Sequence, residues 1–455
     1  MFGAALSRWT LSYVAASLLF LIAGMALMTG GFGYPFDDLR APETLIVVHI
    51  IAIGWLSLLM CGALLQFVPV LVAKPLQLSG AGFPALLFLL TGLCGLIAGF
   101  AALAGIVELP LWMMPFSALF LIIGFSIIIV MLAMTIWSAR PLTLPARFVG
   151  VGLVCLLVVV VLGSLFTLML SGTLEQVFLM EIASSGLSTH VILGLGGWMT
   201  FTAMGVSYRL LTMFMLAPEP AKKTVHMVWT AGVAALALLV FATVFTHWGY
   251  EWTDIVLAVV LVLGVTSIGL YVHDVHSIYG QRKRKTIELN SAASVPAFAA
   301  MLLSLPVAIA LPWVGATDGV VAALVYLFTF GWLTGLSLAQ LYKIVPFLTW
   351  LECYGPVMGK VLTPRVQDIV VESRAKRWFW VYYTGVAIAI IALIVGQTLA
   401  FRVGCALNLV AIFGLSSHFI RARRLMDVPE AMKLPNVISV PHLIYAGSPV
   451  SGRSK

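Results

Sequence analysis

The sequence predicts an all-α, polytopic membrane protein with about twelve transmembrane helices, and three observations lead to this prediction. The 455 residues are 62% hydrophobic and only 9% charged, and the mean hydropathy of +1.10 lies far above that of soluble proteins. Apolar segments of about 20 residues, the length that spans a bilayer, follow one another along the chain. Basic residues gather in every second connection between these segments.

Short polar connections separate the twelve apolar segments. The segments cover residues 8–30, 43–73, 82–107, 112–138, 146–170, 185–216, 223–247, 252–275, 291–312, 318–350, 377–400 and 402–422. No small-residue cleavage site follows the first segment, so we expect a retained helix rather than a signal peptide. The segments together predict a single transmembrane domain over residues 1–424, followed by a tail over residues 425–455.

The placement of charge predicts the orientation of the chain in the membrane. Lys and Arg follow the even-numbered segments, with the runs "QRKRK" at 281–285 and "RARR" at 421–424. The odd connections carry mainly acidic residues, such as Glu108 and Glu175. Under the positive-inside rule both termini are cytoplasmic, and the protein is a multi-pass protein of the cell inner (cytoplasmic) membrane. The net charge of +8 therefore reflects orientation in a lipid bilayer, and we expect no nucleic-acid partner.

A sequence motif recurs three times and divides the chain into units of four helices. The stretch "GWLSLLMCGALLQFVP" at 54–69 matches "GWLTGLSLAQLYKIVP" at 331–346 in 7 of 16 positions. A weaker copy, "GWMTFTAMGVSYRLLT", occupies 197–212. The copies fall on segments 2, 6 and 10, which predicts three four-helix arcs over about 1–140, 141–285 and 286–424 with pseudo-threefold symmetry.

The motif residues have predicted roles in packing, with one open alternative. Small residues let membrane helices approach closely, which favours a packing role for the glycines and hydroxyl residues. The tryptophan lies too deep for an interfacial aromatic belt and is a candidate wall residue of a ligand pocket. Gln66, Arg209 and Lys343 hold the same place in the three copies, and we expect them to snorkel toward lipid phosphates.

A chain of twelve helices in which helices 2, 6 and 10 carry a repeated motif resembles subunit I of the haem-copper oxidase and nitric oxide reductase superfamily. The resemblance covers nearly the whole chain. The chain is also similar to the NnrS-type membrane proteins linked to nitric oxide stress. The resemblance implies a histidine on helix 2 for a low-spin haem and a His-x-His pair on helix 10 for two haems. It further implies three histidines on helices 6 and 7 for copper.

Carried over to this sequence, the resemblance is partial. His49, which precedes Pro69 by 20 residues, matches the haem ligand of helix 2. Tyr326 and Leu324 stand where the His-x-His of helix 10 would be, and His190 occupies on helix 6 the place that matches Leu324. Helix 7 has no adjacent histidine pair. The full oxygen-reducing centre cannot be built from these residues, so whether the chain is an enzyme stays open.

Three histidines are predicted to share one level in the outer half of the membrane. The orientation places His49 and His190 there and brings His247 to the outer end of helix 7. The cofactor-binding candidates are His49, His190 and Tyr326 for haem, and His190 with His247 for a metal such as copper, because imidazole binds both haem iron and copper. The alternatives are an internally hydrogen-bonded or interfacial histidine for His49 and His190, and a headgroup-level anchor for His247.

A further pair, His273 and His276, lies three residues apart around Asp274, and is either a metal site or a solvated helix end.

These observations favour a haem-binding membrane protein, with copper as a second candidate cofactor, that transfers electrons or handles nitric oxide or another diatomic gas. A cytochrome or cupredoxin-like partner would supply the electrons. The helix cores hold almost no Asp, Glu or Lys, which argues against a redox-driven proton pump. Two alternatives stay open: a cofactor-free transporter or channel, and a copper-handling assembly or structural subunit.

Overall fold

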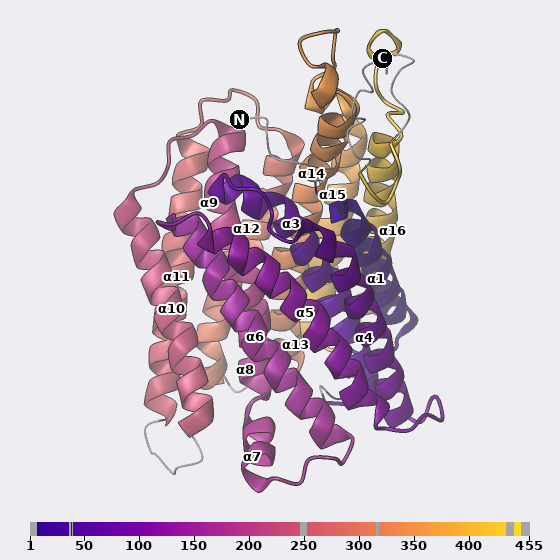
Figure 1. The fold of residues 1–455 in the computed structure, drawn as a ribbon. Coiled ribbons are helices and arrows are strands. Elements are labelled where there is room, and N and C mark those ends of the chain that lie inside the picture. Colours follow the sequence, from indigo (N-terminus) through magenta and orange to yellow (C-terminus); the bar gives the residue numbers. More distant parts are fainter. Residues whose placement is uncertain are drawn as a thin grey trace.

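The computed structural model describes residues 7–35, 38, 40–245, 253–314, 318–433 and 441–446, and these are helical along most of their length (Figure 1). The α-helices are α1 (Thr10–Gly30), α2 (Pro42–His49), α3 (Leu58–Val72), α4 (Gly82–Leu103), α5 (Met113–Trp137), α6 (Leu144–Leu170), α7 (Val177–Ser185), α8 (Leu187–Ile192), α9 (Thr202–Met215), α10 (Lys222–Phe245), α11 (Thr253–Gly280), α12 (Leu289–Val314), α13 (Asp318–Tyr326), α14 (Gly335–Cys353), α15 (Glu372–Ile394) and α16 (Thr398–Arg423). Short 3-10 turns are η2 (Ser79–Ala81), η6 (Gly355–Val357), η7 (Val366–Ile369) and η8 (Glu430–Met432).

The described residues contain twelve helices long and apolar enough to cross a membrane, which confirms the predicted all-α class. The largest difference from the predicted boundaries is in α15, which begins and ends about five residues earlier than the predicted segment 377–400. The charged turn at residues 372–376 is helical, although it lies outside the apolar run. Gly396, with φ of +68°, follows the end of α15. The three-arc arrangement and the orientation stay predictions.

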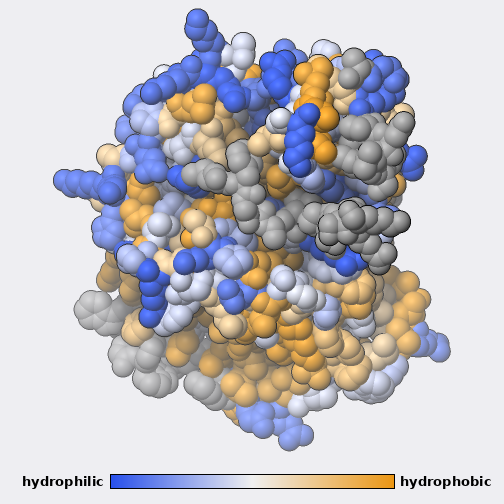
Figure 2. Space-filling view, turned by 45° about the horizontal axis from the view of Figure 1, so that its top comes forward, coloured by the Kyte–Doolittle hydropathy of each residue, from blue (hydrophilic) through white to orange (hydrophobic). Residues whose placement is uncertain are grey.

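The helices stand side by side along one common direction (Figure 1). The most extensive contacts join neighbours in sequence, namely α4 with α5, α10 with α11, and α15 with α16. Helix α1 also packs against α16, so the first and last helices of the chain are neighbours. Hydrophilic side chains gather over the end of the bundle that turns forward in Figure 2, and hydrophobic ones cover the flank beneath it. This distribution fits a bundle whose flank contacts lipid.

Each of the three helices that carry the repeated motif contains a π-helical segment. These segments are η1 (Ile50–Ser57) between α2 and α3, η3 (Leu193–Phe201) between α8 and α9, and η5 (Leu327–Thr334) between α13 and α14. Each segment covers the Gly-Trp pair of its motif copy. π-Helices usually occur as single turns and often lie at functional sites. Three longer π-helical segments at matching places therefore make this part of the bundle a candidate functional region.

Small motif residues lie where helices come closest. A Cβ atom at Gly62 would stand 2.4 Å from the Cβ of Tyr13 on α1, and one at Gly205 would stand 2.4 Å from the Cβ of Phe148 on α6. No larger residue fits either position without movement of the backbone. These glycines have the predicted packing role.

The snorkelling prediction is wrong for two of its three residues. The Gln66 side chain is 2% exposed and accepts a hydrogen bond from the backbone N–H of Ser7 at 2.8 Å. The Lys343 ammonium pairs with the Glu288 carboxylate at 2.6 Å. Because both groups find partners inside the protein, neither needs to reach the lipid headgroups.

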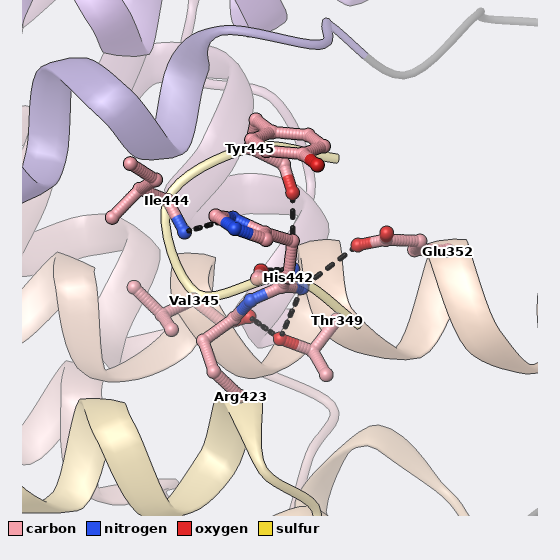
Figure 3. A network of polar contacts seen from close by, with 7 residues as sticks. All are labelled: Val345, Thr349, Glu352, Arg423, His442, Ile444 and Tyr445. Atoms are coloured by element: carbon pink, nitrogen blue, oxygen red, sulfur yellow. Dashed lines mark hydrogen bonds and ion pairs between the residues drawn. The ribbon is translucent and has the colours of Figure 1, made fainter. Parts of the chain in front are cut away.

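The described part of the tail, residues 441–446, is docked on the bundle by a buried arginine (Figure 3). The Arg423 guanidinium, at the end of α16, is 3% exposed. It donates hydrogen bonds to Thr349 Oγ1 at 3.2 Å and Glu352 Oε2 at 2.8 Å on α14. It also donates to the backbone carbonyls of His442 and Tyr445. One side chain thus joins two helices to the tail.

The docked tail also reaches the start of the chain. The backbone N–H of Ala446 donates to the carbonyl of Arg8 at 3.0 Å. The Arg8 guanidinium lies over the ring of Tyr445 at 5.4 Å, which is a cation–π distance. Both described chain ends therefore lie at one end of the bundle, which we call the terminal end.

Candidate functional site

His49 is the last residue of α2 and directly precedes the π-helical segment η1. Its Nδ1 lies 2.8 Å from the carbonyl oxygen of Leu45, one turn earlier. When Nδ1 donates this bond, Nε2 carries the lone pair and is free to bind a metal or accept a proton. The ring of Phe100 on α4 packs against the imidazole at a centroid distance of 5.0 Å. The local structure thus fixes both the orientation and the tautomer of this half-buried side chain.

His190 lies in α8, three residues before the π-helical segment η3. Its ring sits beside Gly163 of α6, where a Cβ atom would approach the imidazole Cε1 to 3.2 Å. Phe166 packs edge-on against it at 5.3 Å. The Nδ1 atom is buried and forms no hydrogen bond of ordinary geometry within the described residues, although the backbone of Val159 on α6 lies near the imidazole. A buried nitrogen without a partner calls for an explanation, and a bound ligand is one.

The two histidines lie within range of a direct electrostatic interaction. The two histidines come near each other because η1 contacts η3 and α3 contacts α6. Both imidazoles stand on the side of these π-helical segments that faces away from the terminal end. The pairing of His49 with His190 in one cofactor site stays a prediction.

Tyr326 takes the same place before η5 that His49 takes before η1. Its side chain is fully buried, and its hydroxyl accepts a hydrogen bond from Asn408 Nδ2 at 2.9 Å. The same hydroxyl lies 3.7 Å from Cys405 Sγ. Both partners belong to α16, so the tyrosine hydroxyl is directed at that helix.

His247 lies outside the described residues, so its proposed pairing with His190 has no structural counterpart. Within the part of the chain that the structure describes, no group of three or more His, Cys, Asp or Glu side chains is arranged to hold a metal ion.

The second histidine pair agrees with the predicted solvated helix end in its two histidines but not in the aspartate between them. His273 and His276 are exposed, whereas Asp274 is 3% exposed. The Tyr208 hydroxyl donates to Asp274 Oδ2 at 2.8 Å, and His273 Nδ1 lies 3.8 Å from Oδ1. Sequence reasoning missed Tyr208, because its proximity to Asp274 depends on the packing of α9 against α11.

A groove of about 370 Å³ opens above Asp274 near the terminal end. The polar residues that line it are Glu219, Thr224, His273, Asp274, Ser277 and Gln281. This volume is within the range of small-molecule sites.

The tryptophans of the three motif copies form a closed ring at the centre of the bundle. Three hydrogen bonds make the ring: Trp55 Nε1 to Thr334 Oγ1 at 2.9 Å, Trp332 Nε1 to Thr200 Oγ1 at 3.1 Å, and Trp198 Nε1 to Ser57 Oγ at 3.3 Å. We call these six residues the Trp–hydroxyl ring. The sequence signal for it was the recurring Gly-Trp-x-Ser/Thr, but the pairing across helices is visible only in three dimensions.

No protein-family model matches the chain, and no curated protein sequence matches it at a significant level.

Proposed function

We propose that the protein is a haem-binding integral membrane protein in which His49 and His190 would hold the haem iron. The observation that carries the proposal is that two imidazoles from neighbouring helices lie near each other inside the apolar bundle, and that the buried Nδ1 atom of His190 forms no hydrogen bond within the described residues. Ionisable side chains within membrane helices are rare and default to a functional role.

The number of available ligands favours haem over a copper ion alone. A haem iron is held mainly by the porphyrin and takes its axial ligands from the protein, so two histidines suffice. Zinc ions bound by side chains alone use three or four of them, as do many copper sites. The described residues offer His49 and His190 at this level, and His247 is the candidate third ligand for a copper ion.

The surroundings of the two histidines suit a redox or gas-binding role. The carbonyl of Leu45 holds the His49 imidazole in the tautomer that binds metal through Nε2, as outer-shell partners of metal-bound histidines do. Phe100 and Phe166 pack beside the two rings and exclude water. When bound by both histidines, haem would supply electron transfer, and binding of a diatomic gas such as nitric oxide would require one of the two histidines to leave the iron.

The proposed setting follows from the charge pattern. Under the positive-inside rule the terminal end is cytoplasmic, and the histidine site lies in the outer half of the inner membrane. A cytochrome or cupredoxin-like partner would then exchange electrons from the outer side. The three-arc arrangement is part of this proposal, and it is supported by the three π-helical segments at matching places.

Visible spectroscopy tests the proposal. The purified protein is expected to show Soret and α bands in a reduced-minus-oxidised spectrum, and His49→Ala and His190→Ala are each expected to lose or shift them. His226→Ala, at an exposed position on α10, is the matched control and should leave the spectrum unchanged. A wild-type protein that stays colourless and free of metal after haem is supplied would rule out the haem function.

A second candidate, a cofactor-free transporter, is favoured by the groove above Asp274. A buried carboxylate in such a groove could bind a cationic substrate. Thermal stabilisation by small organic cations, present in the wild type and lost in Asp274→Asn, would support this candidate over the haem protein.

A further inference from the structure

The Trp–hydroxyl ring ties the three repeats together through a cyclic pattern. Each indole N–H donates to a hydroxyl on the next motif helix, so every hydrogen bond of the ring crosses between repeats. All six side chains are buried, with exposed fractions between 0% and 6%. Buried networks in which every donor has an acceptor reinforce one another and fix a single arrangement of the helices that carry them.

Two of the three ring hydroxyls also bond to the backbone of their own π-helical segments. Ser57 Oγ donates to the carbonyl of Ala52 at 2.8 Å, and Thr200 Oγ1 donates to the carbonyl of Leu195 at 2.8 Å. Both bonds reach back five residues, which is the spacing of a π-helix rather than that of an α-helix. The same hydroxyl thus accepts an indole N–H and satisfies a carbonyl of its own π-helical segment. The ring and the π-helical backbone therefore support each other.

The candidate haem ligands stand directly before two of these segments. His49 immediately precedes η1, and His190 lies three residues before η3. A π-helical turn holds more residues than an α-helical turn. Close packing at Gly62 and Gly205 holds the helices α3 and α9, which follow η1 and η3. If either π-helical segment returned to α-helix, the residues before it would rotate about the helix axis relative to the helix that follows. The direction of each imidazole therefore depends on its π-helical segment.

We propose that the residues of the Trp–hydroxyl ring are positioning residues for His49 and His190. By holding η1 and η3 in the π-helical form, the ring keeps each imidazole in its observed orientation. The relevance to haem rests on the proposed function, but the effect on the two histidine positions does not.

The decisive pair of variants changes a single ring hydroxyl. Thr334→Val removes the acceptor of the Trp55 N–H at nearly constant volume, and Thr334→Ser restores it. Thr334 belongs to the third repeat, so neither substitution alters a residue on the helices that carry His49 and His190. Thr212→Val is the matched control, because the Thr212 hydroxyl is buried and bonds to the carbonyls of its own helix.

The primary measurement does not depend on any cofactor. In a background in which alanine replaces the five cysteines, His49→Cys and His190→Cys are combined and cross-linked with bismaleimides of graded length. We expect Thr334→Val to lower the yield with the shortest effective reagent at least threefold, and Thr334→Ser and Thr212→Val to keep it near the parent value. A parallel measurement on the histidine-bearing protein compares the low-spin haem signals of the same three variants.

The cross-linking result decides the inference whether or not haem is present. Equal yields in Thr334→Val and Thr334→Ser would overturn the positioning role. A colourless wild-type protein with a reduced cross-linking yield in Thr334→Val would reject the haem function and retain the positioning role. Altered haem signals in Thr334→Val, restored in Thr334→Ser, would support both.

Discussion

Replacement of Arg423 is expected to destabilise the protein and release its tail. Arg423→Met removes the guanidinium but keeps much of the apolar stem, so the change mainly deletes the hydrogen bonds to Thr349, Glu352 and the two tail carbonyls. Breaking one partner of a buried ion pair costs about 3–5 kcal/mol. Because Glu352 is 12% exposed and can recover some hydration, we expect the low end, about 3 kcal/mol.

Two measurements test this value. Titration with a denaturing detergent gives the change in the free energy of unfolding, and limited trypsin digestion follows cleavage after Lys433, which precedes the docked segment. We expect faster cleavage in Arg423→Met than in the wild type. Arg424→Met is the matched control, because Arg424 is exposed and its replacement should cost less than about 0.5 kcal/mol. A loss below about 1 kcal/mol with unchanged cleavage would refute the reasoning that Arg423 docks the tail.

Three further predictions concern packing, charge and the ring. Gly62→Ala places a methyl group 2.4 Å from a Cβ atom of α1, and should cost about 1–3 kcal/mol in the same titration; a neutral result would show that the helices can separate. The hydrogen bonds from Arg421 hold the pKa of Asp427 below its usual range. The carboxylate therefore contributes stability above its ordinary pKa of about 4, and this contribution is lost as the pH falls through its lower folded value. Asp427→Asn should remove that part of the acid dependence, and an unchanged pH profile would contradict the assignment. A double-mutant cycle of Trp55→Phe and Thr334→Val should give a coupling of about 0.6–1.7 kcal/mol, whereas additive effects would mean that the ring bond contributes nothing.

The sequence predicted the parts of the fold that depend on local hydrophobicity. A helix that spans the bilayer needs a long apolar run, so the number of helices and most of their ends could be predicted from composition alone. The end of α15 could not, because Gly396 interrupts a region that is apolar on both sides. The π-helical segments were also missed, since the residues that form them are ordinary helix residues in sequence.

The candidate site was predictable in its residue types but not in its contacts. His49 and His190 stood out because histidines are rare in membrane helices. The orphaned Nδ1 of His190 and the hydrogen bond of His49 depend on neighbouring turns and helices that no motif encodes. Polar residues expected to face lipid, such as Gln66, proved to have partners brought close by the chain ends. The partners of these side chains come from distant parts of the chain, and the spacing of residues along one helix does not predict them.

The three repeats retain the scaffold and differ in the residues available for chemistry. Tryptophan and a hydroxyl residue recur in every copy and close one ring, so each copy is structurally equivalent at that level. At the level just before the π-helical segments the copies diverge: the first presents His49, the second His190, and the third Tyr326. The tyrosine hydroxyl bonds to Asn408 on α16, so the third repeat fills its own position with a core contact. A shared ring preceded by different residues separates fold from function, and it directs the search for chemistry to the space between the first two repeats.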